Sequence, residues 1–404
     1  MKKLFFRALS SFLAFILLFA PVSATSETVS DTSSSTLSWE KLEEQIKAKS
    51  PSYQILDKNI SSIEIVDYTY LYNSMQKQLN ELSSMQSYLL ESGDREKLNT
   101  LNSSMAALRN TYEDIRDGKL QRDSDDAVNQ LRNMQNQVIS AGQTLYITIL
   151  SLEQSLADGE RGLSALQRAL TEMQLRHTLG QVSDIKLKEL ERRYDDTKSQ
   201  LKTLENTITS LKAQLQLLIG EAPTGEAELE ALPSVSVDEI ASLTPETDLI
   251  AAKQKNYSIS TAAVALEKSE EDVSDKNSDY LSGSIKRYEL TSAEHTRDAA
   301  KLSLISAEQN FEFSFRNLHR SVLNCQQIWE NKKAAAKYQQ QLLALSEKQY
   351  NLGRISYFAL LNAQDNASNA LSDAESAERD LFSALNNYRN AVMYGFVNEQ
   401  TQEG

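Results

Sequence analysis

Helix-breaking residues are scarce in this 404-residue chain, which holds only five prolines and twelve glycines. The prolines lie at positions 21, 51, 223, 233 and 245, so the stretches 52–222 and 246–404 contain none. Proline removes a backbone donor and interrupts helices, and its absence leaves both stretches free to form long ones. The sequence therefore predicts an all-α fold.

Residues that carry chemistry are equally few. The single cysteine, Cys325, excludes an internal disulfide, and its helical apolar surroundings near Trp329 favour a small buried hydrophobe over a reactive thiol. The three histidines, His177, His295 and His319, lack the spacing of a metal site. No phosphate-cradling glycine loop, dinucleotide fingerprint or nucleophile elbow is present. We predict no catalytic residue, metal or cofactor, and the chain is not expected to be an enzyme.

The N-terminus has the order of a secretory signal. Lys2, Lys3 and Arg7 precede an apolar run over 12–20, and Val-Ser-Ala follows at 22–24. An uncleaved membrane anchor is the alternative, but this run is about half of the roughly 20 residues that span a bilayer. We expect cleavage near residue 24 and export of the mature protein.

Acidic residues outnumber basic ones, 56 to 42, for a formal charge of −14. Removing the three basic residues of the signal leaves 39 basic against 56 acidic residues, a formal charge of −17. Nucleic acid and anionic membrane surfaces are therefore not expected partners.

Composition and breaker residues divide the chain into two comparable halves. Small polar residues dominate 25–36, and two glycines and three prolines interrupt the helical pattern within 220–245. The predicted organisation is a signal peptide at 1–24, a flexible Ser/Thr-rich leader at 25–37, a first helical-hairpin repeat at 38–220, a linker at 221–245, a second helical-hairpin repeat at 246–396 and a polar tail at 397–404.

A turn motif occurs once in each half. It reads His-Thr-Leu-Gly-Gln-Val-Ser over 177–183 and Tyr-Asn-Leu-Gly-Arg-Ile-Ser over 350–356, an offset of 173 residues. Gly180 and Gly353 are suited to the left-handed conformation that ends an incoming helix. The motif predicts a tight turn between two antiparallel helices.

The residues after each glycine are suited to start the outgoing helix. Ser183 and Ser356 can each accept a hydrogen bond from an unpaired backbone amide as an N-cap. Val182 and Ile355, each with a leucine four residues into the helix, have the spacing of a hydrophobic staple.

Apolar residues continue in steps of three and four over 187–218, and the same register recurs 173 residues later, rich in alanine. This stripe predicts about 60 Å of antiparallel coiled coil per hairpin. At the far ends, Pro51 and Pro245 are interpreted as openings of equivalent helices, and Gly93 and Gly283 as turns. The longer first half predicts an extra short helix near 95–117.

Together with Leu-Leu-Ile-Gly at 217–220 and Leu-Asn-Ala-Gln at 361–364, the paired motif resembles the TolC-like outer-membrane efflux family. The resemblance spans roughly 38–396. It implies a coiled-coil α-barrel subunit made of two tandem repeats of long antiparallel helical hairpins, and a homo-oligomer, a trimer, whose tips dock to a periplasmic adaptor of an inner-membrane transporter.

By this resemblance, the adaptor-binding residues are those of the two hairpin tips. They are Leu179, Gly180, Gln181, Val182, Ser183, Leu352, Gly353, Arg354, Ile355 and Ser356.

The sequence departs from the family in having no clear transmembrane β-strands, since the brief alternation over 66–72 has no paired neighbour. It thus gives no support for direct membrane insertion. The leading hypothesis is an export component, an oligomeric helical duct that passively conducts substrates. The alternative is an extracytoplasmic coiled-coil scaffold or interaction protein without channel activity. The expected location is the cell envelope, at the outer membrane or periplasm by family resemblance, or at the cell surface of a cell without an outer membrane.

Overall fold

The computed structural model describes residues 36–92 and 95–397, so the predicted signal peptide, most of the leader and nearly all of the polar tail lie outside the described residues. The described part is helical and contains no β-strand, which confirms the all-α prediction. Within it, no helix combines the length and apolarity needed to cross a membrane. The helices are α2 (Trp39–Lys49), α3 (Pro51–Glu64), α4 (Tyr68–Ser92), α5 (Arg95–Arg116), α6 (Lys119–Thr178), α7 (Asp184–Leu218), α8 (Val237–Ala241), α9 (Pro245–Lys255), α10 (Tyr257–Leu281), α11 (Arg287–Asn351) and α12 (Tyr357–Tyr394).

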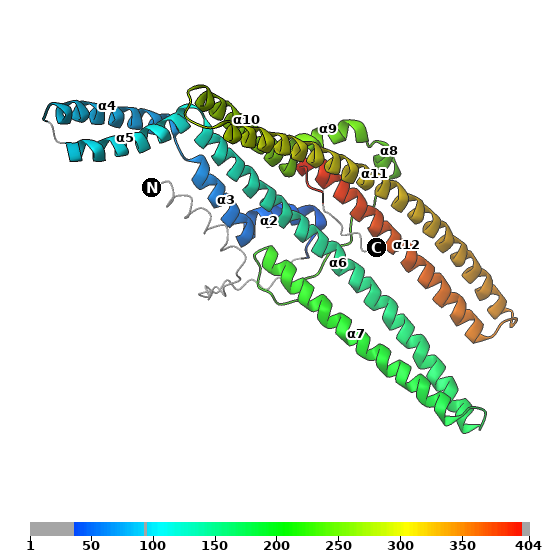
Figure 1. The fold of residues 1–404 in the computed structure, drawn as a ribbon. Coiled ribbons are helices and arrows are strands. Elements are labelled where there is room, and N and C mark those ends of the chain that lie inside the picture. The colour runs from blue at the N-terminus through cyan, green and yellow to red at the C-terminus, as the bar shows by residue number, and fades with distance from the viewer. Residues whose placement is uncertain (1–35, 93–94, 398–404) are drawn as a thin grey trace. The chain divides into compact units, whose positions relative to one another are not determined.

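Two long antiparallel hairpins dominate the fold, α6 with α7 and α11 with α12 (Figure 1). Helices α6 and α11 run for 60 and 65 residues, which the proline-free sequence permits. Helices α7 and α12, of 35 and 38 residues, are about 50–60 Å long at 1.5 Å per residue. The predicted coiled-coil length is therefore close to the observed one.

The two hairpins pack against each other through α6 and α12, which are antiparallel. Three polar pairs join the two helices, and as the residue number of the α6 member rises, the residue number of its α12 partner falls. The pairs are Gln143 with Asn390, Gln154 with Ser372, and Arg168 with Asp365. Because α6 ends and α12 begins at a hairpin turn, the antiparallel packing places both turns at the same end (Figure 1).

The internal repeat aligns differently from the sequence prediction. Helices α2 and α9 each have 11 residues and are each followed by one non-helical residue, Ser50 or Asn256. The side chains of both residues accept a hydrogen bond from the backbone N–H three positions later, which starts α3 and α10. Pro51 therefore opens the second helix of its repeat, whereas Pro245 opens the first. Pairing the two prolines was wrong, because proline suits the first turn of any helix.

A glycine closes each repeat against this junction. Gly220 follows α7 with φ +73°, and a Cβ on it would lie 2.4 Å from the carbonyl oxygen of Lys49. Gly395 follows α12 with φ +64°, and its Cβ would lie 2.4 Å from the carbonyl carbon of Lys255 and 2.5 Å from the nitrogen of Asn256. Glycine is thus required twice over, by backbone conformation and by close approach.

The core surrounds these junctions. One buried cluster includes Phe315, Leu381 and Leu385 of the second repeat, and another includes Ile46 and Leu215 of the first. Trp39 packs against both clusters and joins them. Each large side chain buried in this way stabilises the fold by roughly 1.5–3 kcal/mol.

The first described residues belong to this core. Leu37 is 4 % exposed, and its N–H and C=O pair with the backbones of Glu228 and Glu230 at 2.8 and 3.0 Å. The Tyr146 hydroxyl lies within hydrogen-bonding distance of the carbonyl oxygens of both Leu37 and Glu230, at 2.8 and 2.7 Å. The prediction that the flexible leader extends to residue 37 was therefore wrong at that residue. A single leucine after a Ser/Thr-rich run forms no periodic pattern, so the sequence did not indicate that Leu37 is buried.

The extra element of the first half is larger than predicted. Helix α5 confirms a helix near 95–117, but it pairs with α4 in a two-helix hairpin inserted between α3 and α6. Tyr72 of α4 and Tyr112 of α5 stack with ring centroids 4.8 Å apart, and their hydroxyls are 2.6 Å apart. The alternating residues 66–72 mostly enter α4. Gly118 and Gly283, both with positive φ, precede the two long helices, whereas Gly93 lies outside the described residues.

Candidate functional site

The two hairpin turns have the same backbone geometry. Gly180 and Gly353 adopt φ +69° and +68°. At each turn the glycine N–H and the next N–H bond back into the last helical turn, to His177 and Arg176 in one case, both at 2.9 Å. In the other turn the acceptors are the carbonyls of Tyr350 and Gln349, both at 2.8 Å. This is the Schellman pattern that ends a helix, as the motif predicted.

The predicted caps differ between the turns. The Ser356 hydroxyl accepts a hydrogen bond from the N–H of Ala359 at 3.2 Å, which confirms that cap. Ser183 occupies the N-cap position, but its side chain makes no capping bond. The next residue, Asp184, instead pairs with Lys188 at 2.9 Å, and this hydrogen bond lowers the pKa of the Asp184 carboxyl. A carboxylate in the first turn also interacts favourably with the helix dipole.

The tip leucines face solvent. Leu179 is 64 % exposed and Leu352 is 67 % exposed, whereas Val182 and Ile355 are half-buried at the entry of the outgoing helices. A Cβ on either tip glycine would meet no atom within 4 Å. Each turn therefore carries one exposed leucine at the equivalent position, directly before its glycine.

Charge distinguishes the two turns. Gln181 in the first turn is neutral, and the equivalent position in the second turn is Arg354. No ion pair of Arg354 occurs among the described residues, and its side chain is exposed. The second turn therefore presents a leucine and an uncompensated guanidinium side by side.

An ion pair and several hydrogen bonds join the two hairpins on the core side of the turns. Arg168 of α6 donates to Asp365 of α12 at 2.6 Å, each about a dozen residues from its turn. Ser372 of α12 accepts from the Gln154 amide at 2.6 Å and donates to Asp158 at 2.5 Å. These contacts fix the axial register of α6 against α12 and hence of the two turns.

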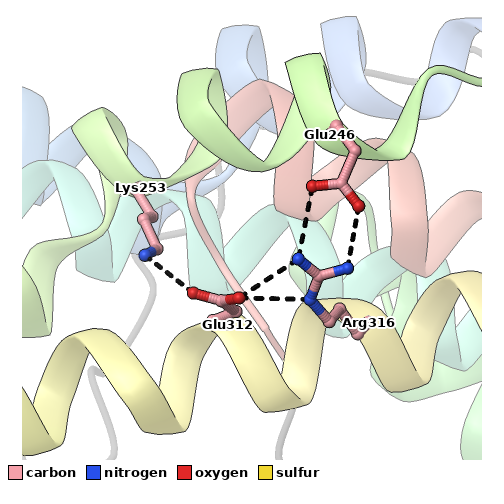
Figure 2. A network of polar contacts seen from close by, with 4 residues as sticks. All are labelled: Glu246, Lys253, Glu312 and Arg316. Atoms are coloured by element: carbon pink, nitrogen blue, oxygen red, sulfur yellow. Dashed lines mark hydrogen bonds and ion pairs between the residues drawn. The ribbon is translucent and has the colours of Figure 1, made fainter.

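Near the middle of α11, a four-residue network attaches α9 (Figure 2). Arg316 donates two hydrogen bonds to Glu246, at 2.8 and 3.2 Å, and also contacts Glu312 at 3.1 Å. Lys253 donates to the other oxygen of Glu312 at 3.1 Å. The hydrogen bonds from Lys253 and Arg316 lower the pKa of the Glu312 carboxyl. Such exposed pairs mainly position α9 and stabilise the fold only weakly.

Residues considered for chemistry lie apart from one another. His177 lies in the last helical turn of α6, while His295 and His319 lie on α11. Cys325 packs half-buried against the core beside Trp329, which is 7 % exposed, and burial raises the pKa of the thiol. In the described ranges, no three His, Cys, Asp or Glu side chains gather as a metal site would require.

No protein-family model matches the sequence, and no curated protein matches it. Solved structures do. The fold is similar to the open-state MtrE outer membrane channel of Neisseria gonorrhoeae, with a TM-score of 0.54 and 14 % identity over 92 % of this chain and 94 % of that one. It is similar to the outer-membrane channel OprN, with a TM-score of 0.55 and 12 % identity over 88 % and 89 % of the two chains. The Campylobacter jejuni CmeC outer membrane channel gives a TM-score of 0.54 at 12 % identity, over 72 % and 69 %.

The chain has the fold of these outer-membrane channels. The TolC-like resemblance drawn from the paired turn motif is thus confirmed at the level of the fold. At 12–14 % identity, the likeness is one of fold alone.

All ten residues proposed at the tips lie in the two turns, and the antiparallel packing of α6 and α12 brings the turns to one end. Their role in adaptor binding stays a prediction. Sequence reasoning missed the exposed aromatics beside the second turn, Tyr357 and Phe358. Their place directly after Ser356 in the motif is the signal that could have found them.

Proposed function

We propose that this chain is the duct-forming component of an envelope export system and docks to an adaptor protein through its two hairpin turns. The observation that carries the proposal is the pair of like turns, held at one end and each presenting an exposed leucine. The likeness to outer-membrane channels supports the duct at the level of the fold.

Conduction requires more than one copy, because the two hairpins of a single chain cannot enclose a conduit. By family resemblance the assembly is a trimer. Large apolar side chains are exposed along α11, including Phe313, Leu323 and Leu345, and would be covered by neighbouring copies. The duct would act passively, with the energy supplied by an inner-membrane transporter, and without enzymatic chemistry of its own.

The location follows from the same inference. An export duct works in the cell envelope, at the outer membrane or periplasm, or at the surface of a cell that has no outer membrane. The predicted signal peptide at 1–24 is consistent with that destination.

The mass of the purified protein in solution tests assembly. Light scattering would be measured for the protein alone, with detergent, and with a candidate adaptor. A trimer in any of these conditions supports the duct. A monomer in all three supports the scaffold alternative and counts against conduction.

Docking is tested separately at the second turn. The Arg354→Glu substitution reverses an unpaired charge at the turn and is expected to weaken adaptor binding about tenfold or more, with unchanged helicity. Arg320→Glu, the same change at an exposed position of α11 away from the turn, is the matched control. Equal adaptor affinity for both variants would remove the turn from the interface.

A further inference from the structure

A wide groove lies beside the core, far from the hairpin turns. Residues of α6, α10 and α11 line it together with Asn256, which precedes α10, and the segment 395–397, and its volume is about 680 Å³. This volume lies within the roughly 300–1,000 Å³ typical of small-molecule sites. On α6 the groove reaches Asn133 and Gln137, about 60 Å along the helix from the turn at 1.5 Å per residue. It is therefore separate from the proposed docking surface.

Among the residues that the structure describes, none that lines the groove is charged. Charged residues make up 24 % of this chain, so fifteen lining residues taken at random would include about four. Four amide side chains and four serines line it instead. With no charged side chain to pair with an ion, and with a chain of net charge −14 that repels anions, an anionic ligand is disfavoured.

Part of this polar lining is free to bind a ligand. Asn133, Gln137, Ser258 and Ser314 make no side-chain hydrogen bond within the described part of the chain. Amides offer both donors and acceptors, and each hydroxyl can do either. Such a surface matches a ligand that itself presents many hydroxyl or amide groups, and a purely apolar ligand would leave these groups unpaired.

Aromatic side chains complete the lining. Tyr257 and Phe396 are half-buried, Phe311 lies at the floor at 6 % exposure, and the exposed Leu302 stands on the rim. Aromatic faces combine a large apolar contact area with little loss of side-chain freedom. Such a mixed lining complements a ligand that has flat C–H faces, which can pack on the aromatic rings, and hydroxyl groups, which can bond to the amides and serines.

We propose that this groove binds a neutral glycan, a short stretch of a polyhydroxylated chain. The proposal does not depend on the export function, because the lining residues are separate from the turns. It gives the helical body a point of attachment to saccharide material in the envelope.

The test is direct binding of neutral trisaccharides to the purified protein. Maltotriose, cellotriose and triacetylchitotriose would be titrated by calorimetry, with saturation-transfer NMR to detect weak contacts. Binding of at least one is expected in the micromolar to millimolar range, and the anionic trisaccharide trigalacturonate is expected to bind at least tenfold more weakly.

Two substitutions probe the groove. Asn310→Ala and Tyr257→Ala remove a polar group and a ring from it, and each is expected to lower the affinity for the bound trisaccharide about tenfold or more. Gln309→Ala changes the neighbouring exposed amide outside the lining and is expected to leave affinity unchanged. Circular dichroism confirms that each variant keeps its helicity.

Three results would overturn the proposal. One is no binding of any trisaccharide up to about 10 mM, which corresponds to less than about 3 kcal/mol of binding free energy. Another is an equal loss of trisaccharide affinity in the two groove variants and in the Gln309→Ala control. The third is a smaller oligomeric mass for Tyr257→Ala without glycan binding, which would make the groove a contact between copies.

Discussion

Replacing Gly395 by alanine is expected to destabilise the fold more than the same change at a hairpin turn. The residue has φ +64°, and the left-handed conformation costs an alanine roughly 1–2 kcal/mol. The new Cβ would also lie 2.4 Å from the carbonyl carbon of Lys255 and 2.5 Å from the nitrogen of Asn256. Both are backbone atoms, so α12 and the α9–α10 junction must move apart, at a cost of about 1–3 kcal/mol. The expected loss is about 2–5 kcal/mol.

Substitutions at two further glycines separate the cost of the left-handed conformation from the cost of the steric clash. Gly353 has φ +68°, and a Cβ added to it would meet no atom within 4 Å. Gly353→Ala is therefore expected to lower the free energy of unfolding only by the cost of the left-handed conformation, roughly 1–2 kcal/mol. Gly162 lies inside α6 with nothing within 4 Å, so Gly162→Ala is expected to stabilise the fold by up to about 1 kcal/mol.

Urea unfolding followed by far-ultraviolet circular dichroism gives the three differences in the free energy of unfolding. The expected order of stability is Gly162→Ala, then the unchanged protein, then Gly353→Ala, then Gly395→Ala. If Gly395→Ala and Gly353→Ala lose equal stability, the close approach of α12 to the α9–α10 junction does not constrain the fold, and the reasoning is refuted.

Three other substitutions or reactions probe the interior. Gln143→Leu removes the acceptor of hydrogen bonds from the Asn386 and Asn390 amides, at 2.9 and 2.7 Å, and is expected to cost about 2–4 kcal/mol in urea unfolding; replacing all three by leucine should restore much of the loss. Burial raises the pKa of Tyr146 to about 12 from 10.0, so the folded state favours the protonated phenol. That stability is present below pH 10 and is lost as pH rises toward 12, and Tyr146→Phe should show a shallower alkaline decline in unfolding free energy. Burial raises the pKa of the Cys325 thiol, so its reaction with a disulfide reagent at pH 8 should be about tenfold slower in the native than in the urea-unfolded protein, and equal rates would contradict its packing against the core.

The sequence by itself determined the fold class and the two turns. The lack of proline over 52–222 and 246–404 and the steps of three and four leave few alternatives to long paired helices. The turn motif is a local device, since a left-handed glycine and a helix cap depend on neighbours within a few residues. Local rules therefore predicted Gly180 and Gly353 correctly.

Only the tertiary structure decided which helices of the two repeats are equivalent and which potential capping side chains form a hydrogen bond. Pro51 and Pro245 both suit a first helical turn, and only the packing of Gly220 and Gly395 against the helix junctions shows that they open different helices. Ser183 could have capped α7, but its side chain makes no capping bond. The uncharged groove brings together residues more than 250 positions apart along the chain, from Asn133 to Phe396. Which residues line this groove depends on how α6, α10 and α11 pack against one another. The periodicity of apolar residues within one helix does not indicate which other helix packs beside it.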